Sequence, residues 1–114
     1  MEPKKKLVRE NRERKIQNAI KDMLRKKEWT VMETHGNMYQ CGFPDLYACC
    51  REHGQRWIEV KVDGNYDFTS AQLKYFPLIQ ASGIGIWILT AATYQEYEKL
   101  FKEPNWYMYL YRKL

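Results

Sequence analysis

Two carboxylates and a lysine, Asp45, Glu59 and Lys61, have the types and the spacing to form a metal centre. Asp45 opens one predicted strand, and Glu59 and Lys61 lie in another, residues 57–62. Because side chains alternate across a strand, Glu59 and Lys61 share one face while the apolar residues of the strand take the other. A hairpin through residues 51–55 would place Asp45 across from residues 59 to 61, so that two carboxylates and one ammonium converge.

These residue types suit a hard divalent cation. Mg²⁺ is usually held by one or two carboxylates and keeps several waters, which is the ligand supply that Asp45 and Glu59 offer. We expect Mn²⁺ to substitute for it. A lysine two residues after the second carboxylate can orient or deprotonate the attacking water, or neutralise charge that grows on a phosphate in the transition state. We therefore predict a metal-dependent nuclease centre.

The elements that would position this centre follow the order α-β-β-β-α-β-α-β. In the second helix, Leu73 and Phe76 are spaced to face the sheet, and Pro77 would bend or interrupt the segment. Two predicted strands, at 84–89 and at 106–111, are apolar on both faces. For the segment at 84–89 this pattern predicts a central strand of the sheet. The predicted ranges are a helix over 8–27, strands over 29–34, from 45 and over 57–62, a helix capped at 69–70 and running to 81, a strand over 84–89, a helix with capping-box spacing over 93–102, and a strand over 106–111.

The motifs resemble those of a known family. Gly-x-Pro-Asp at 42–45, Glu-x-Lys at 59–61 and Gln72 on the following predicted helix are similar to the VRR-NUC branch of the PD-(D/E)XK nucleases. The resemblance runs from residue 13 to about residue 90. It implies a single nuclease domain over residues 1–114 with a restriction endonuclease-like α/β core, in which helices flank a mixed central sheet.

The resemblance also implies an activity, a divalent-metal-dependent DNA endonuclease. Asp45, Glu59 and the Val60 carbonyl would hold the metal, and Lys61 and Gln72 would position the attacking water. Free-standing members of the family resemble Holliday junction resolvases, so we expect a homodimer that prefers branched DNA such as four-way junctions.

Two alternatives stay open. The same centre could act on nicked, flapped or RNA-containing substrates, or the chain could be a catalytically silent nucleic-acid-binding module. Pro-Asp alone is a common turn and Glu-x-Lys a common surface pattern, so only their combination is informative. A silent module has no chemical need for the carboxylates, because they repel phosphate unless a cation lies between them.

Glu13 is a further candidate for the centre. It stands three residues before Ile16 and seven before Ile20, so it lies on the apolar side of the first helix, where a carboxylate needs a partner. The resemblance implies that it faces the metal site and assists through a second metal or a bridging water. The alternative is a simple interaction with the helix dipole.

Basic residues concentrate at the start of the chain. Residues 1 to 27 hold 11 Lys and Arg against 4 Asp and Glu, whereas the remainder holds 8 against 10, within a net charge of +5. Such a segment suits a polyanionic substrate, since phosphate contacts supply most sequence-independent affinity for nucleic acid. The predicted DNA contacts are Lys4, Lys5, Lys6 and Arg9, with His35 and Lys74 as weaker candidates that could equally be ordinary surface residues.

The remaining composition bounds the class of protein. Cys41, Cys49 and Cys50 are an odd number, which favours reduced packing thiols over a disulfide framework. Their spacing from His35 and His53 fits no structural zinc pattern. No apolar run reaches the roughly 18 residues that span a bilayer, and the start lacks the apolar segment of a signal peptide, so we expect a cytoplasmic protein without a membrane partner.

Overall fold

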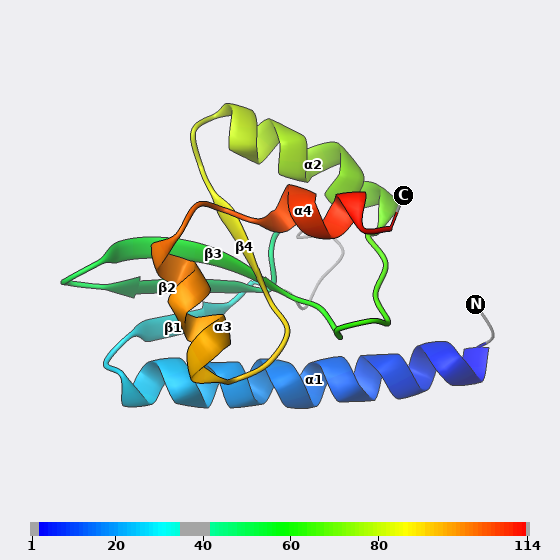
Figure 1. The fold of residues 1–114 in the computed structure, drawn as a ribbon, viewed down its shortest axis with the longest axis horizontal. Helices are drawn as coiled ribbons and strands as arrows, with labels where there is room; N and C mark the ends of the chain where they lie inside the picture. The colour runs from blue at the N-terminus through cyan, green and yellow to red at the C-terminus, as the bar shows by residue number, and fades with distance from the viewer. Residues whose placement is uncertain (1–2, 35–41, 114) are drawn as a thin grey trace.

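The structure, a computed structural model, describes residues 3–34 and 42–113, with side chains from residue 8 onward in these ranges. Figure 1 shows three layers, in which α1 runs along one face of the sheet while α2 and α4 lie over the other. Among the described residues no helix has both the length and the apolar character that crossing a membrane requires. The elements are α1 (Pro3–Lys26), β1 (Thr30–Glu33), β2 (Leu46–Cys50), β3 (Gly54–Val60), α2 (Ser70–Ala81), β4 (Ile86–Leu89), α3 (Tyr94–Glu98), the 3-10 helix η2 (Lys99–Phe101) and α4 (Trp106–Tyr111).

The described strands form one mixed sheet in the order β1-β2-β3-β4. The first three strands pair antiparallel, and β4 lies parallel to β3. Parallel neighbours need a crossover connection, and the segment that contains α2 supplies it. The predicted α/β class, with a mixed sheet flanked by helices, is confirmed.

Strand β4 lies at the edge of this sheet, so the prediction of a central strand at 84–89 is wrong. Its Ile86, Ile88 and Leu89 are nevertheless fully buried, because helices cover both faces. The free edge is blocked by the side chain of Asn105, which accepts a hydrogen bond from the N–H of Ile88 (2.6 Å) and donates one to its carbonyl (3.2 Å). One amide thus satisfies the ladder groups that a further strand would use.

The face of the sheet that packs on α1 is apolar. Ile58 and Val60 of β3 are fully buried in one cluster with Ile20 and Leu24 of α1. The two helix residues are four apart and so lie on the same side of the helix. The predicted first helix is confirmed, although it begins at Pro3 rather than at residue 8.

The last element is a helix, α4, so the predicted strand at 106–111 is wrong. Alternate apolar residues suggested a strand, but Trp106 and Tyr109, three apart, are the residues that the helix buries. They pack with Phe76 of α2 on the second face of the sheet. Because Asn105 already occupies the edge of β4, a strand here would find no pairing groups at Ile88.

Helix α2 confirms the predicted helix over residues 69–81. Thr69 caps it, and Pro77 lies inside the helix without ending it. Phe76 is fully buried, as predicted, whereas Leu73 is 46% exposed, so its predicted packing on the sheet is wrong.

The third predicted helix is confirmed in two parts, α3 and η2. The hydroxyl of Thr93 accepts a hydrogen bond from the N–H of Glu96, which is half of the predicted capping box. The carboxylate of Glu96 instead contacts Thr90 and Lys99. Burial alone would raise the pKa of Glu96, but these hydrogen bonds outweigh burial and lower it.

Candidate metal centre

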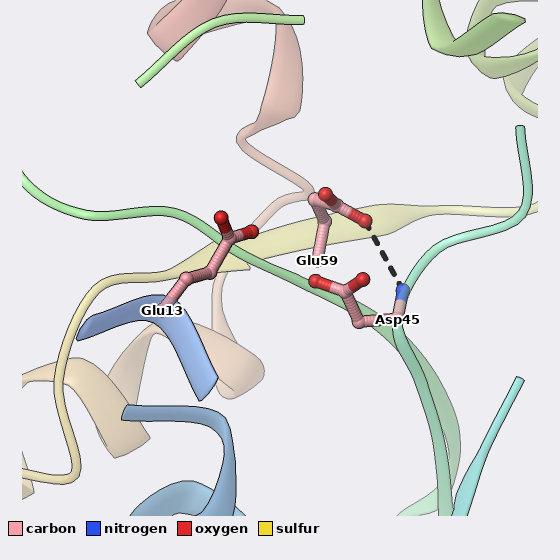
Figure 2. A group of neighbouring side chains, drawn as sticks. All are labelled: Glu13, Asp45 and Glu59. Carbon is pink, nitrogen blue, oxygen red and sulfur yellow. Dashed lines mark hydrogen bonds between the residues drawn. The ribbon is translucent and has the colours of Figure 1, made fainter. Parts of the chain in front are cut away.

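Three carboxylates from separate elements meet at one end of the sheet. Glu13 belongs to α1, Asp45 immediately precedes β2, and Glu59 lies in β3. One oxygen from each lies within 4.8 Å of the other two. Figure 2 shows the three side chains turned toward a common space. Hard oxygen donors at this separation fit a divalent cation such as Mg²⁺.

The β2–β3 hairpin sets Asp45 against Glu59. Leu46 pairs with Ile58, so Asp45 lies just beyond the paired segment. The N–H of Asp45 donates to the Glu59 carboxylate (3.1 Å), and the Asp45 carboxylate accepts from the N–H of Val60 (2.8 Å). Side chains therefore extend the ladder by one step, and the predicted convergence of Asp45 with residues 59 to 61 is confirmed.

The turn before Asp45 is held on both sides. Gly42 has a φ of +91°, and a Cβ atom there would lie 2.6 Å from the ring of Tyr75 on α2. Glycine is therefore required both by the backbone and by the close approach. Thr34 donates its hydroxyl to the carbonyl of Pro44 and its N–H to the carbonyl of Asp45, which ties the turn to the segment after β1.

Glu59 is the most deeply buried of the three carboxylates, with 1% of its surface exposed. Burial, and after it the charge of Asp45, raise the pKa of Glu59 from 4.5 to about 8, although the ammonium of Lys61 opposes the rise. A cation at this position would lower that pKa again, because it favours the charged form.

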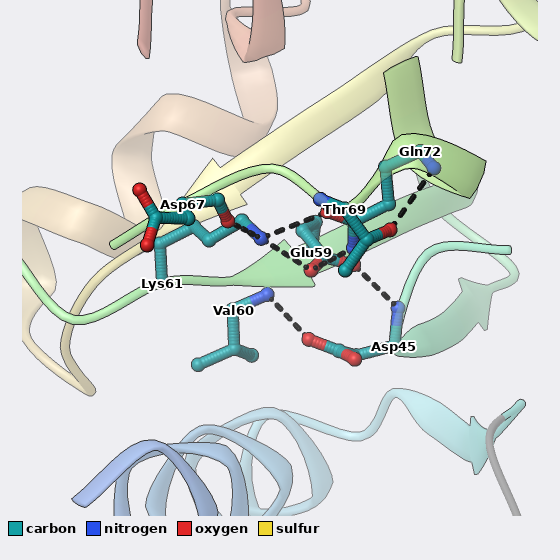
Figure 3. A network of polar contacts seen from close by, with 7 residues as sticks. All are labelled: Asp45, Glu59, Val60, Lys61, Asp67, Thr69 and Gln72. Carbon is teal, nitrogen blue, oxygen red and sulfur yellow. Dashed lines mark hydrogen bonds and ion pairs between the residues drawn. The ribbon is translucent and has the colours of Figure 1, made fainter. Parts of the chain in front are cut away.

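Lys61 is buried immediately after β3, with 4% of its surface exposed. Its ammonium donates to the carbonyl of Asp67 (2.8 Å) and to the amide oxygen of Gln72 (3.0 Å), and it lies 3.2 Å from the carboxylate of Glu59. It also sits over the ring of Phe68, 4.7 Å from the centroid. These contacts hold a positive charge beside the carboxylates (Figure 3).

Gln72 joins the first turn of α2 to the centre. Its amide nitrogen donates to the Glu59 carboxylate (2.7 Å), while its amide oxygen accepts from Lys61 and from the N–H of Thr69. The hydroxyl of Thr69 accepts in return from the N–H of Gln72, so the two residues form a capping box. The side-chain amide of Gln72 is therefore held both by the N-cap residue Thr69 and by Glu59 and Lys61 of the centre.

The carboxylates open onto a cleft of about 430 Å³. Glu13 borders it, and burial, followed by the charge of Asp45, raises the pKa of Glu13. Arg9, one turn earlier on α1, donates to Asp67 (2.9 Å) and closes one side. The lining consists of Arg9, Glu10, Glu13, Asp45, Glu59, Lys61, Tyr66, Asp67, Phe68, Thr69 and Gln72.

The structure therefore brings together Glu13, Asp45, Glu59, Lys61 and Gln72, as predicted from the sequence. Of the predicted DNA contacts, Arg9 lines the cleft, whereas Lys74 is exposed on α2 with its ammonium over the ring of Tyr75. His35 and the side chains of Lys4, Lys5 and Lys6 lie outside the described residues.

The loop from residue 66 to residue 69 contributes contacts that the sequence prediction missed. The Asp67 carbonyl fixes Lys61, Phe68 lies beneath the ammonium, and the side chain of Asp67 binds both Arg9 and Lys113. Thr69 and Gln72 have the spacing of a capping box, and this signal could have predicted the orientation of the Gln72 amide.

Cysteine contributes nothing to a metal site within residues 3–34 and 42–113. Cys49 and Cys50 are free and half-buried. In these ranges, the carboxylates described above are the one group of three or more His, Cys, Asp or Glu side chains close enough to share an ion. Cys41 lies outside the described residues.

Comparison of the chain with protein-family models, with curated proteins and with solved structures gives no match. The fold and the geometry of the site therefore carry the functional argument.

Proposed function

We propose that this chain is a divalent-metal-dependent nuclease that hydrolyses phosphodiester bonds in DNA. The observation that carries the proposal is the meeting of Glu13, Asp45 and Glu59 within 4.8 Å, beside the buried ammonium of Lys61. Carboxylates at this distance repel one another unless one of them is protonated or a cation lies between them, and a cation would also allow the phosphate of a substrate to approach them.

Asp45 and Glu59 would hold the ion, with Glu13 completing the set of carboxylates. The Val60 carbonyl is a candidate fourth ligand, because the N–H and C=O of one extended residue point to the same edge, and the N–H of Val60 faces Asp45. A bound divalent ion would supply Lewis-acid stabilisation of the charge that develops on the phosphate and would lower the pKa of water.

Lys61 would stabilise the transition state through its charge. An ammonium has three N–H donors, and acceptors on Asp67, Gln72 and Glu59 already lie within reach of them. Without rearrangement, Lys61 therefore contributes a fixed positive charge rather than a free donor. Gln72 holds both Lys61 and Glu59 and is a positioning residue in this scheme.

Arg9 would contact the phosphate backbone. Its guanidinium borders the cleft and is bound to Asp67, which leaves further N–H donors for a phosphate. It is the described member of the basic segment at the start of α1 that reaches the cleft, so it joins that segment to the centre.

We also propose the PD-(D/E)XK nuclease fold, because the order of elements from α1 to β4 and the places of Asp45, Glu59, Lys61 and Gln72 agree with that resemblance. A homodimer that prefers four-way junctions stays a prediction. The two apolar strand faces predicted at 106–111 do not support this dimer, because the segment is a helix that buries Trp106 and Tyr109 in the core.

The test is cleavage of end-labelled single-stranded, duplex, flapped and four-way-junction DNA in Mg²⁺, in Mn²⁺ and in EDTA. We expect cleavage with either metal and none in EDTA. Asp45→Asn should remove it, because the amide can still accept from the N–H of Val60 but is a poor cation ligand. Nucleic-acid binding without cleavage under every condition would favour the silent module instead.

A further inference from the structure

A row of aromatic rings runs along the hairpin whose strands position Asp45 and Glu59. The rings of Phe43 and Trp57 are 6.1 Å apart between centroids, and those of Trp57 and Tyr47 are 4.9 Å apart. We call Phe43, Tyr47 and Trp57 the aromatic platform. It is formed by the turn before β2 and by the two strands of the hairpin that carries the centre.

The aromatic platform continues directly from the centre. Phe43 stands two residues before Asp45. Trp57 stands two residues before Glu59 in β3, and side chains two apart on a strand share a face. The turn that bears Phe43 is fixed, because Gly42 packs against the ring of Tyr75 and no side chain fits there. Trp57 also packs against the core cluster of Phe76 and Trp106, so the same hairpin holds the rings and the carboxylates in place.

The outer end of the platform faces solvent. Phe43 is 50% exposed and Tyr75, beside Gly42, is 42% exposed. The ammonium of Lys74 lies 5.2 Å from the centroid of the Tyr75 ring. Aromatic faces next to a cation are the features with which proteins bind unpaired nucleic-acid strands, because bases stack on the rings and phosphates contact the cation.

We propose that the aromatic platform binds unpaired bases of the strand whose phosphate occupies the carboxylate cleft. The position of that phosphate rests on the proposed nuclease function. In an uninterrupted duplex the bases already stack on one another and cannot reach the rings, whereas single strands, flaps and branch points offer free bases. The substrate class is therefore nucleic acid with unpaired bases next to the cut site, and stacking selects it without regard to base sequence.

Binding without cleavage tests this directly. A 2-aminopurine-labelled single strand and a duplex of the same sequence are titrated with the protein in Ca²⁺, an oxygen-binding cation that stands in for Mg²⁺ between the carboxylates and the phosphate, and fluorescence quenching reports stacking. We expect tighter binding of the single strand, with quenching. Phe43→Ala and Phe43→Leu should weaken its binding by about tenfold, whereas Phe43→Tyr should retain it. Leucine keeps apolar volume without a ring, so this pair separates stacking from packing.

Tyr94→Ala is the matched control, since Tyr94 is 65% exposed on α3 and belongs to neither the platform nor the cleft lining. Unchanged single-strand affinity in folded Phe43→Ala, or equal affinity of the wild-type protein for duplex and single strand, overturns the proposal. So does a dimer that Phe43→Ala dissociates in sedimentation, because the platform would then bind a second copy of this chain. Loss of stacking in Phe43→Ala without any cleavage of DNA by the wild-type protein supports the platform and refutes only the nuclease.

Discussion

The raised pKa of Glu59 makes the stability of the metal-free protein depend on pH. Glu59 is fully enclosed, and its pKa is raised from 4.5 to about 8 by burial and by the charge of Asp45. The folded state therefore holds the Glu59 proton more tightly than the unfolded state. The stabilisation is complete below about pH 4.5 and is lost as the pH rises to about 8.

The size of this pH effect on the free energy of unfolding follows from how far the pKa of Glu59 is raised. Each pKa unit corresponds to about 1.4 kcal/mol, so a rise from 4.5 to about 8 amounts to a few kcal/mol in the free energy of unfolding. Glu96 and Asp67, whose pKa values are lowered, contribute stability that is lost only as the pH falls through the acid range, below this window.

The perturbation is Glu59→Gln, which is uncharged at every pH. Urea denaturation in EDTA between about pH 5 and pH 8.5 should show the free energy of unfolding of the wild-type protein decreasing with pH. The slope should be clearly smaller in Glu59→Gln, where the raised pKa of Glu13 still contributes a part of it, and unchanged in Glu52→Gln, whose carboxylate is exposed on the hairpin. Equal slopes in the wild-type protein and Glu59→Gln would refute the reasoning.

Further predictions concern the neighbours of Glu59 and the edge of β4. Lys61→Ala should lower turnover by orders of magnitude while divalent-metal affinity, measured by calorimetry, falls far less; an equal loss of affinity would make Lys61 structural. Gln72→Ala should reduce activity less than Asp45→Asn. It should also lower the free energy of unfolding by about 1 kcal/mol, measurable by thermal denaturation, because the N–H of Thr69 loses the hydrogen bond to the Gln72 side chain. Asn105→Ala should lower the free energy of unfolding by about 1–3 kcal/mol, because the N–H and carbonyl of Ile88 lose their hydrogen-bond partner. Its cleavage rate at low temperature should match that of the wild-type protein, and a lower rate would connect the edge of β4 to the centre.

Local rules predicted that Asp45, Glu59 and Lys61 could converge, whereas the place of Glu13 at the centre was implied by the family resemblance. The two-residue period of a strand placed Glu59 and Lys61 together, and the hairpin brought Asp45 to them, as the register of β2 and β3 confirms. Thr69 marked the start of α2 and so put Gln72 in the first turn of that helix, while the place of Gln72 beside the carboxylates was implied by the family resemblance. These relations involve neighbours along the chain or across one turn.

The errors concern distant contacts. An apolar segment such as 84–89 fits a central strand and an edge strand equally well until the position of Asn105 is known. Residues 106–111 satisfy the periods of both strand and helix, and the choice depends on the space that α2 and the sheet leave for Trp106. The hydrogen bond from Lys61 to the carbonyl of Asp67 could not be predicted, because every residue carries a backbone carbonyl and the sequence does not mark the one that is used.

Divalent-metal binding by the purified chain is the most direct test of the carboxylate centre. Mn²⁺ titrated by calorimetry near pH 8 should bind saturably to the wild-type protein, and below that pH binding should release a proton, since Glu59 must ionise to coordinate the ion. Asp45→Asn should lose most of this affinity and Glu52→Gln should keep it. Absence of saturable binding in the folded wild-type protein, or undiminished binding in Asp45→Asn, would contradict the assignment of Glu13, Asp45 and Glu59 as a metal centre.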